Sequence, residues 1–286
     1  MYNIILVLSF LALWIAIQIP ENLEYYIGYF LVLTIGIGHG ANDLRIYFNH
    51  RRMSIKKSIA FTALYAMAVL IGFGLFFLQP AAVLGLFLVV SGYHFGEEHF
   101  ERFSWNSSML KKLFETFYGL NIILCLLYLN ATDSLPVIKD LTTLELSGIS
   151  LEWSFYTVSL LTLLTGFFMF KNVKATLIFK ELLYLIIIFI IFKTSSLIWG
   201  FTIYFILWHS IPSIHHQIIY LHDKVNRVSV LDYLKASIFY WIASLFMLGG
   251  LYYFLKEDLT LLLSIIVAFL GGITFPHVFV MNKLHN

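Results

Sequence analysis

The sequence predicts an all-α fold: a polytopic membrane helix bundle with about ten transmembrane helices, within a range of eight to ten. Of the 286 residues, 60% are hydrophobic and only 12% are charged, whereas soluble domains carry about 25% charged residues. The mean hydropathy is +0.86. The apolar residues also form long continuous runs, which favour helices over the short alternating segments of a membrane barrel. This composition excludes a soluble enzyme, a disordered chain and a disulfide-stapled secreted module.

Ten segments have the roughly 20 mainly apolar residues that a helix needs to cross the hydrocarbon core. We expect them at residues 2–19, 25–44, 58–78, 81–98, 113–130, 153–170, 176–192, 196–218, 236–255 and 259–281. No segment marks a second domain, so residues 1–286 are expected to form a single integral-membrane domain. The N-terminal run lacks a basic region and a small-residue cleavage site, which favours a retained span over a signal peptide.

The distribution of positive charge predicts the orientation, because Lys and Arg accumulate in cytoplasmic loops. All but three of the 18 Lys and Arg residues fall in loops on one side of the predicted bundle, the exceptions being Lys139, Lys193 and Lys256. Both termini are therefore expected in the cytoplasm, and the chain is expected to be a multi-pass protein of the inner (plasma) membrane. The net charge of +2 and the lack of a long basic run argue against a nucleic-acid partner.

The ten histidines are unusual in so apolar a chain, because a polar group in lipid is costly unless it is satisfied. Four are expected in or beside cytoplasmic loops as solvated residues: His50, His99, His222 and His285. The other six fall on the second, fourth, eighth and tenth predicted spans: His39, His94, His209, His215, His216 and His277.

Three of these histidines are predicted to lie at one depth. His39, His94 and His209 come about 13 to 14 residues into their spans, which at 1.5 Å per residue is about 20 Å below the outer surface. A common depth on separate helices indicates a shared metal site, with structural hydrogen bonding or a proton path as the alternative. Neutral imidazole suits iron, zinc, copper or nickel, so the residue type alone does not choose the metal.

Two of the histidines lie in glycine-rich contexts with nearby carboxylates. His39 lies in Gly-His-Gly-Ala-Asn-Asp and His94 in Ser-Gly-Tyr-His-Phe-Gly-Glu-Glu. Asp43 and Glu98 each follow four residues after a histidine, which on a helix puts acid and imidazole on one face. Such an acid either holds the far ring nitrogen of a metal-bound histidine or marks the water boundary. The glycines either let helices approach closely or open space beside the imidazole.

The third context is Trp-His-Ser-Ile-Pro-Ser-Ile-His-His. Pro212 removes a helix hydrogen bond and favours a kink. His209 and His216 share a helical face but are separated by about 10 Å of rise, so either a kink brings them together or only one of them binds a metal. His277 follows Pro276, which is another position where a helix is expected to be broken.

These segments, together with the terminal Phe-Pro-His-Val, resemble those of the Brp/Blh-type (bacteriorhodopsin-related protein-like) β-carotene 15,15′-dioxygenases, which are membrane enzymes of bacteria and archaea. The resemblance covers most of the chain. It implies a non-haem Fe(II) held by histidines, with O2 as co-substrate. The implied reaction is cleavage of the central double bond of β-carotene, or a related carotenoid, into two retinals. It also implies a functional link to a retinal-binding rhodopsin.

By the same resemblance, His39, His94 and His209 match the first three ligand histidines. The family has a fourth histidine four residues after the third, where this chain has Ser213. Helical phase favours His216 as the replacement. The residues that could instead hold a ligand histidine in place or bind the metal themselves are Asp43, Glu98, His215 and His277. The chain also has Gly38 where the family has proline, and Asp43-Leu44 where the family has an Asp-His pair. These departures leave the exact carotenoid and the cleavage position open.

Two other membrane functions compete with this hypothesis. A secondary transporter would use the intramembrane histidines as proton relays. A histidine-box desaturase or hydroxylase would need tight HxxxH and HxxHH clusters, whereas this sequence has one adjacent pair, His215-His216. A purely structural subunit is the third alternative.

Overall fold

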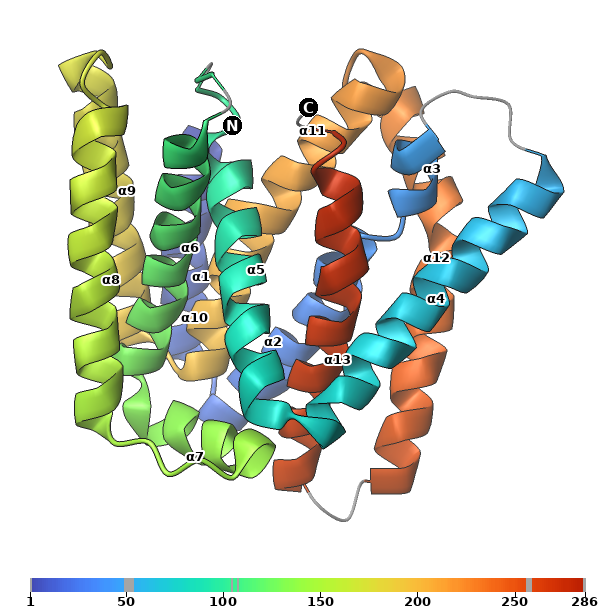
Figure 1. Cartoon of the computed structure of the whole chain (residues 1–286), viewed down its shortest axis with the longest axis horizontal. Helices are drawn as coiled ribbons and strands as arrows, with labels where there is room; N and C mark the ends of the chain where they lie inside the picture. Colours follow the sequence, from blue (N-terminus) through green and yellow to red (C-terminus); the bar gives the residue numbers. More distant parts are fainter. Residues whose placement is uncertain (1, 49–53, 104, 107, 256–258, 285–286) are drawn as a thin grey trace. The chain divides into compact units, whose positions relative to one another are not determined.

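The computed structural model describes residues 2–48, 54–103, 105–106, 108–255 and 259–284, and within these residues the chain is helical without a strand (Figure 1). The predicted all-α class is therefore confirmed. Among the described residues, eight helices are long and apolar enough to cross a membrane. Two shorter apolar helices, Tyr2–Gln18 and Leu23–Gly36, correspond to the first two predicted spans. The count of ten and the cytoplasmic termini stay predictions.

The chain divides into two compact units. The first unit comprises Met1–Phe30, Leu88–Lys139 and Leu144–His209. The second unit comprises Leu31–Phe87, Asp140–Thr143 and Ser210–Asn286. The expectation of a single membrane domain stays a prediction. Two of the histidines expected in loops, His50 and His285, lie outside the described residues, as does Lys256.

Most of the helical elements before Ile211 lie wholly or mainly in the first unit. The elements are α1 (Tyr2–Gln18), α2 (Glu21–Leu31), α5 (Pro80–Phe100), α6 (Met109–Leu129), α7 (Ala131–Thr142), α8 (Gly148–Met169), α9 (Ala175–Thr194), α10 (Leu197–Ile203) and the π-helix η2 (Tyr204–Ser210). α6 packs against α8 and α9, and Asn121 of α6 donates to Ser159 of α8 at 2.6 Å. Trp199 of α10 donates to the carbonyl of Ala12 in α1 at 3.1 Å.

Glycines let α5 and α6 approach until their backbones touch. A Cβ added at Gly96 would overlap the carbonyl of Glu115, and one added at Gly119 would overlap the carbonyl of Gly92. Small residues allow this kind of close contact between membrane helices. The expectation that the glycines flanking His94 serve close packing is confirmed.

The second unit holds the remaining elements: the π-helix η1 (Val32–Gly36), α3 (Asp43–Phe48), α4 (Ile55–Leu78), α11 (Ile211–His222), α12 (Arg227–Leu255) and α13 (Leu259–Met281). α4 packs closely on α13, since a Cβ on Gly72 would lie 3.1 Å from the Cα of Gly272. A buried apolar cluster that includes Ile46, Ile218 and Tyr233 joins α3, α11 and α12.

Within the described residues, serine side chains cap the N-termini of four helices. In each case the side-chain oxygen accepts a hydrogen bond from the backbone N–H three residues later, which satisfies a donor that the helix leaves open. These N-caps are Ser54 of α4, Ser108 of α6, Ser147 of α8 and Ser196 of α10. The caps explain why α4 and α6 begin several residues before the apolar runs that predict them.

The predicted span 25–44 is not one helix, and this prediction is wrong. α2 passes at Leu31 into the π-helix η1, the helix ends at Gly38, and residues 39–42 form a turn before α3 begins at Asp43. The run Gly-Ile-Gly-His-Gly occupies this stretch, and repeated glycine lowers helix stability because its backbone loses the most entropy on ordering. His39 and Asp43 therefore do not share a helical face.

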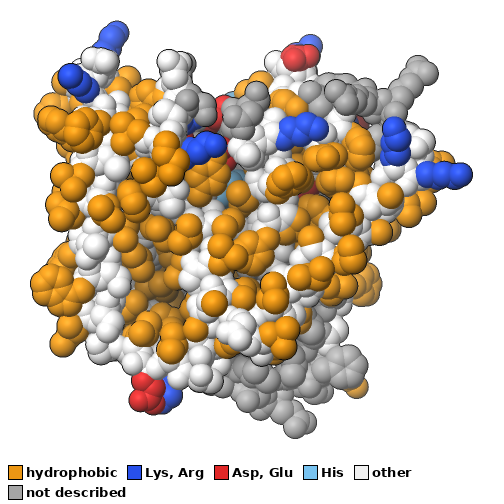
Figure 2. Space-filling view, viewed as in Figure 1, with side chains coloured by type: hydrophobic (Ala, Val, Ile, Leu, Met, Phe, Trp, Pro, Cys, Tyr) orange, Lys and Arg blue, Asp and Glu red, His pale blue; other side chains and the backbone are white. Residues whose placement is uncertain are grey.

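The outer face of the first unit suits a lipid environment. Trp153, Leu163 and Phe167 of α8 and Phe179 of α9 are exposed. Figure 2 shows hydrophobic side chains over these helices between their ends, with charged side chains near the ends. A soluble protein rarely exposes such an extended apolar surface, so the helices are those of a membrane protein.

Candidate metal centre

Two buried histidines form a pair in the first unit. His94 lies on α5 and His209 on η2, and both are buried. Their ring centroids are 4.7 Å apart with an interplanar angle of 80°. The ring of Phe205 stacks on His209 at 5.6 Å, and Phe95 lies 4.6 Å from it. These aromatic rings exclude water from one side of the imidazole pair.

A π-helix presents His209. η2 covers Tyr204–Ser210 and is followed by α11, in whose first turn Pro212 lies. Proline has no N–H to donate to the carbonyl four residues earlier, and its ring clashes with that carbonyl. A wider π-turn directly before the proline relieves this conflict. The irregularity predicted at Pro212 takes this form, whereas the break expected at Pro276 is not found, since α13 continues through it to Met281. π-Turns often occur at functional sites because they shift a side chain out of the regular helical register.

A second pair of buried histidines lies in the second unit. His39 follows η1 and His277 lies on α13, with ring centroids 4.7 Å apart and an interplanar angle of 89°. The Nδ1 of His39 donates to the carbonyl of Gly36. A carbonyl oxygen accepts only, so this contact fixes the proton on Nδ1 and leaves the lone pair of His39 on Nε2.

Asp43 fixes His277 in the same tautomer. Its two carboxylate oxygens lie 3.0 and 2.9 Å from the Nδ1 of His277. Tyr65 of α4 donates to the same carboxylate at 2.7 Å. Metal-binding histidines commonly donate their second nitrogen to a carboxylate or carbonyl in this way. The sequence left two roles open for Asp43, support of the preceding His39 or a place at the water boundary, and the structure instead buries it and brings it to His277.

The turn that carries His39 is tied to two helices. Gln217 of α11 donates to the backbone carbonyl of His39 at 3.0 Å. Tyr233 of α12 donates to the side chain of Gln217 at 2.7 Å. Asn42 donates to the backbone carbonyl of Tyr233 at 3.2 Å. Because these groups are buried, their hydrogen bonds hold the turn in one conformation.

The remaining predicted site residues lie in different surroundings. His215 and His216 are half-buried on α11, with ring centroids 5.8 Å apart. Glu98 is buried on α5, one helical turn after His94. The prediction that His216 is the fourth ligand, made from helical phase, stays a prediction.

The expectation that His99 is a solvated loop residue is wrong. α5 continues to Phe100, so His99 lies inside the first unit and is 2% exposed. Its Nε2 lies 2.9 Å from the carboxylate of Glu181 and 3.1 Å from the hydroxyl of Tyr118. Arg102 donates to the other oxygen of Glu181 at 2.5 Å. The Nε2 of this buried histidine is therefore satisfied by a network of polar partners.

The supporting residues Tyr65, Glu181 and Tyr233 were not found from the sequence. Each meets its partner across a large separation along the chain, which no local pattern encodes. Gln217 did leave a signal, since it is an amide directly after the His215-His216 pair in an apolar span.

Both histidine pairs lie in a part of the chain that matches a known protein family. The family model described as beta-carotene 15,15′-dioxygenase matches residues 30–285. The chain belongs to this family. In this member of the beta-carotene 15,15′-dioxygenase family, the matched region contains every candidate ligand and both histidine pairs. The family implies a carotenoid as substrate. No curated protein and no solved structure matches the chain.

Proposed function

We propose that this protein is a membrane-embedded, iron-dependent dioxygenase that cleaves the central 15,15′ double bond of β-carotene with O2 into two retinals. The observation that carries the proposal is the family match over residues 30–285, within which lie two buried pairs of facing imidazoles. The plasma membrane is the proposed location, and a retinal-binding rhodopsin is the proposed consumer of the product.

The proposed ligands of one ferrous iron are His39, His94 and His209, with a fourth histidine. His216 is the candidate favoured by helical phase. His277 is favoured by its burial, its contact with His39 and its hydrogen bonds to Asp43, and we propose it as the fourth. All four are neutral nitrogen donors of the kind that binds Fe(II). Bound iron would supply the site at which O2 is activated.

The residues around the histidines have two tasks in this proposal. Asp43 and the carbonyl of Gly36 hold protons on the Nδ1 atoms of His277 and His39, so the Nε2 atoms of both rings are the donors. Phe95 and Phe205 shield His209 from water, which protects a reactive site from side reactions. Carotenoid substrate dissolves in the bilayer and would reach the protein laterally through its apolar surface.

Expression of the gene in a β-carotene-producing bacterium tests the proposed reaction. Central cleavage predicts loss of colour and the appearance of retinal, with two retinals formed for each β-carotene consumed. His94→Ala should keep the colour, while His222→Ala, a substitution at a half-buried histidine on α11, should bleach like the wild type. Persisting colour with membrane-inserted wild-type protein would contradict the proposal, and two unequal apocarotenals would contradict central cleavage.

A further inference from the structure

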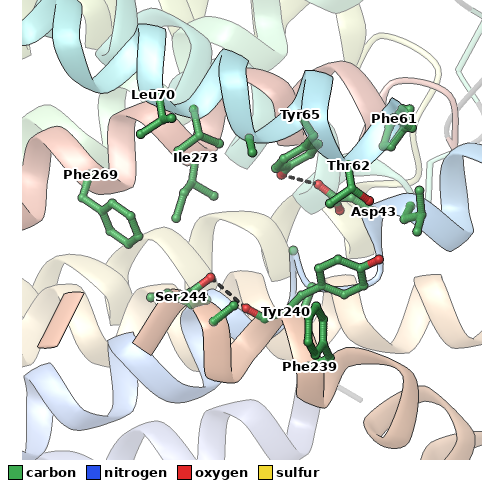
Figure 3. Close-up of a pocket in the computed structure, with 17 residues that line it drawn as sticks. Asp43, Phe61, Thr62, Tyr65, Leu70, Phe239, Tyr240, Ser244, Phe269 and Ile273 are labelled. Atoms are coloured by element: carbon green, nitrogen blue, oxygen red, sulfur yellow. Dashed lines mark hydrogen bonds between the residues drawn. The ribbon is translucent and has the colours of Figure 1, made fainter. Parts of the chain in front are cut away.

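The second unit contains a pocket whose lining includes one of the predicted site residues, Asp43. It encloses about 320 Å³ and is lined by α4, α12, α13 and the segment from Ile37 to Leu44. Figure 3 shows Phe61, Leu70, Phe239, Phe269 and Ile273 among the side chains that surround it. Most of the lining is apolar, which is typical of a site for a hydrophobic small molecule.

The inner end of this pocket reaches the histidine pair of the same unit. Asp43 and Gly40 both line the pocket. Asp43 is hydrogen-bonded to His277, and a Cβ added at Gly40 would lie 3.4 Å from the Nδ1 of His277. A molecule that fills the pocket to its inner end therefore lies next to the residues that hold His277.

One side of the pocket faces the surface between α4 and α12. Leu70 of α4 is 59% exposed and Phe239 of α12 is 72% exposed. Ala66 and Ala243, one on each of these helices, are exposed pocket-lining residues with minimal side chains. Both helices are candidate membrane spans, so this mouth opens toward the acyl chains of the bilayer rather than toward water.

The lining changes in character along the pocket. Thr62 and Tyr65 lie beside Asp43 at one end, whereas Leu70, Phe269 and Ile273 line the other end (Figure 3). The hydroxyl of Tyr65 is directed at the carboxylate of Asp43. The carboxylate and hydroxyl groups at the Asp43 end, together with the apolar side chains at the far end, suit a long hydrocarbon that reacts at the Asp43 end.

We propose that this pocket binds one arm of the carotenoid, which enters from the bilayer between α4 and α12. The inference rests on the proposed function, because that function supplies the substrate. β-Carotene is symmetric about its central double bond, so each arm consists of one end ring and half of the polyene. The pocket volume of about 320 Å³ is near the lower limit of the roughly 300 to 1,000 Å³ found for ligand sites. It therefore suits one arm rather than the whole molecule.

Two pocket-filling variants test this assignment against a matched control. Ala66→Phe and Ala243→Phe each place a phenyl ring in the pocket from a different helix. Ala63→Phe makes the same change at an exposed alanine of α4 that does not line the pocket. Each variant is purified in lipid nanodiscs, its iron content and thermal unfolding are measured, and β-carotene is titrated without oxygen so that binding is separated from cleavage.

Both pocket variants should raise the Kd for β-carotene at least tenfold and the KM for cleavage in parallel, with iron content unchanged. Ala63→Phe should match the wild type in all three quantities. Wild-type affinity and cleavage in both pocket variants would overturn the pocket assignment and leave the proposed function intact. The assignment is also overturned if the variants lose only co-purified phospholipid, since the pocket is then an acyl-chain site. A wild-type protein that neither binds nor cleaves β-carotene would remove the proposed function itself, and the assignment with it.

Discussion

Asp43→Asn changes the support of His277 with almost no change of shape. The wild-type carboxylate accepts from the Nδ1 of His277 and from the hydroxyl of Tyr65, and the Asp43 and His277 side chains are each 4% exposed. The amide keeps one acceptor oxygen but loses the negative charge. Hydrogen bonds to charged groups contribute about 1.5–3 kcal/mol and neutral ones about 0.5–1.5 kcal/mol, so the substitution removes about 1–2 kcal/mol.

This loss should appear in iron binding, because a less basic and less firmly oriented His277 is a weaker ligand. A loss of 1–2 kcal/mol corresponds to an increase of about 5- to 30-fold in the Kd for Fe(II). Anaerobic titration of the apoprotein with ferrous iron, read against a competing chelator, measures this change. Asp43→Ala, which leaves the Nδ1 proton without its acceptor, should weaken binding by up to about 100-fold.

Asp232→Asn is the matched control, since Asp232 of α12 forms an ion pair with Arg45 of α3 at 2.8 Å. Asp232→Asn makes the same chemical change and also weakens a contact that holds α3. This ion pair is half-exposed, so its contribution to the free energy of folding is small. Iron affinity in Asp232→Asn should equal that of the wild type. Equal losses in Asp43→Asn and Asp232→Asn would refute the reasoning, because they would show that α3 placement rather than ligand support controls the iron.

Three further predictions follow from the two histidine pairs and the helix packing. A single alanine substitution at His39, His94 or His209 should abolish cleavage and iron retention without preventing membrane insertion. His277→Ala should lose most of the iron and His216→Ala should retain it, as measured by metal analysis of each purified variant; the reverse result would assign the fourth position to His216. Gly96→Ala should prevent stable folding, because its methyl group overlaps the α6 backbone at Glu115, and detergent gel filtration with thermal unfolding would show this as aggregation or a lowered Tm.

The sequence predicts the helical class well, because lipid requires every backbone group to be satisfied within a helix and long apolar runs have few alternatives. It also singles out His39, His94 and His209 as histidines within apolar spans, where an imidazole is costly, and all three are buried. Their role as iron ligands stays a prediction. The glycines beside His94 indicated that another helix could approach closely, but not that α6 is this helix.

The partners of the histidines were harder to predict. The helix at His39 was expected to continue, so the one histidine partner considered for Asp43 was His39. The run of glycines instead ends the helix, and the following turn presents Asp43 to His277 from α13. Tyr65 joins the same carboxylate from α4. Such tertiary contacts depend on how helices pack, which no local pattern specifies.

The iron content of the purified wild-type protein tests the central claim most directly. After anaerobic reconstitution and removal of loosely bound metal, we predict about one iron per chain, together with the formation of two retinals per β-carotene when oxygen is admitted. The same preparation of His94→Ala should contain little iron and form no retinal. Two irons per chain in the wild type would indicate the diiron chemistry of a desaturase or hydroxylase, and retinal formation by an iron-free wild-type protein would contradict the account.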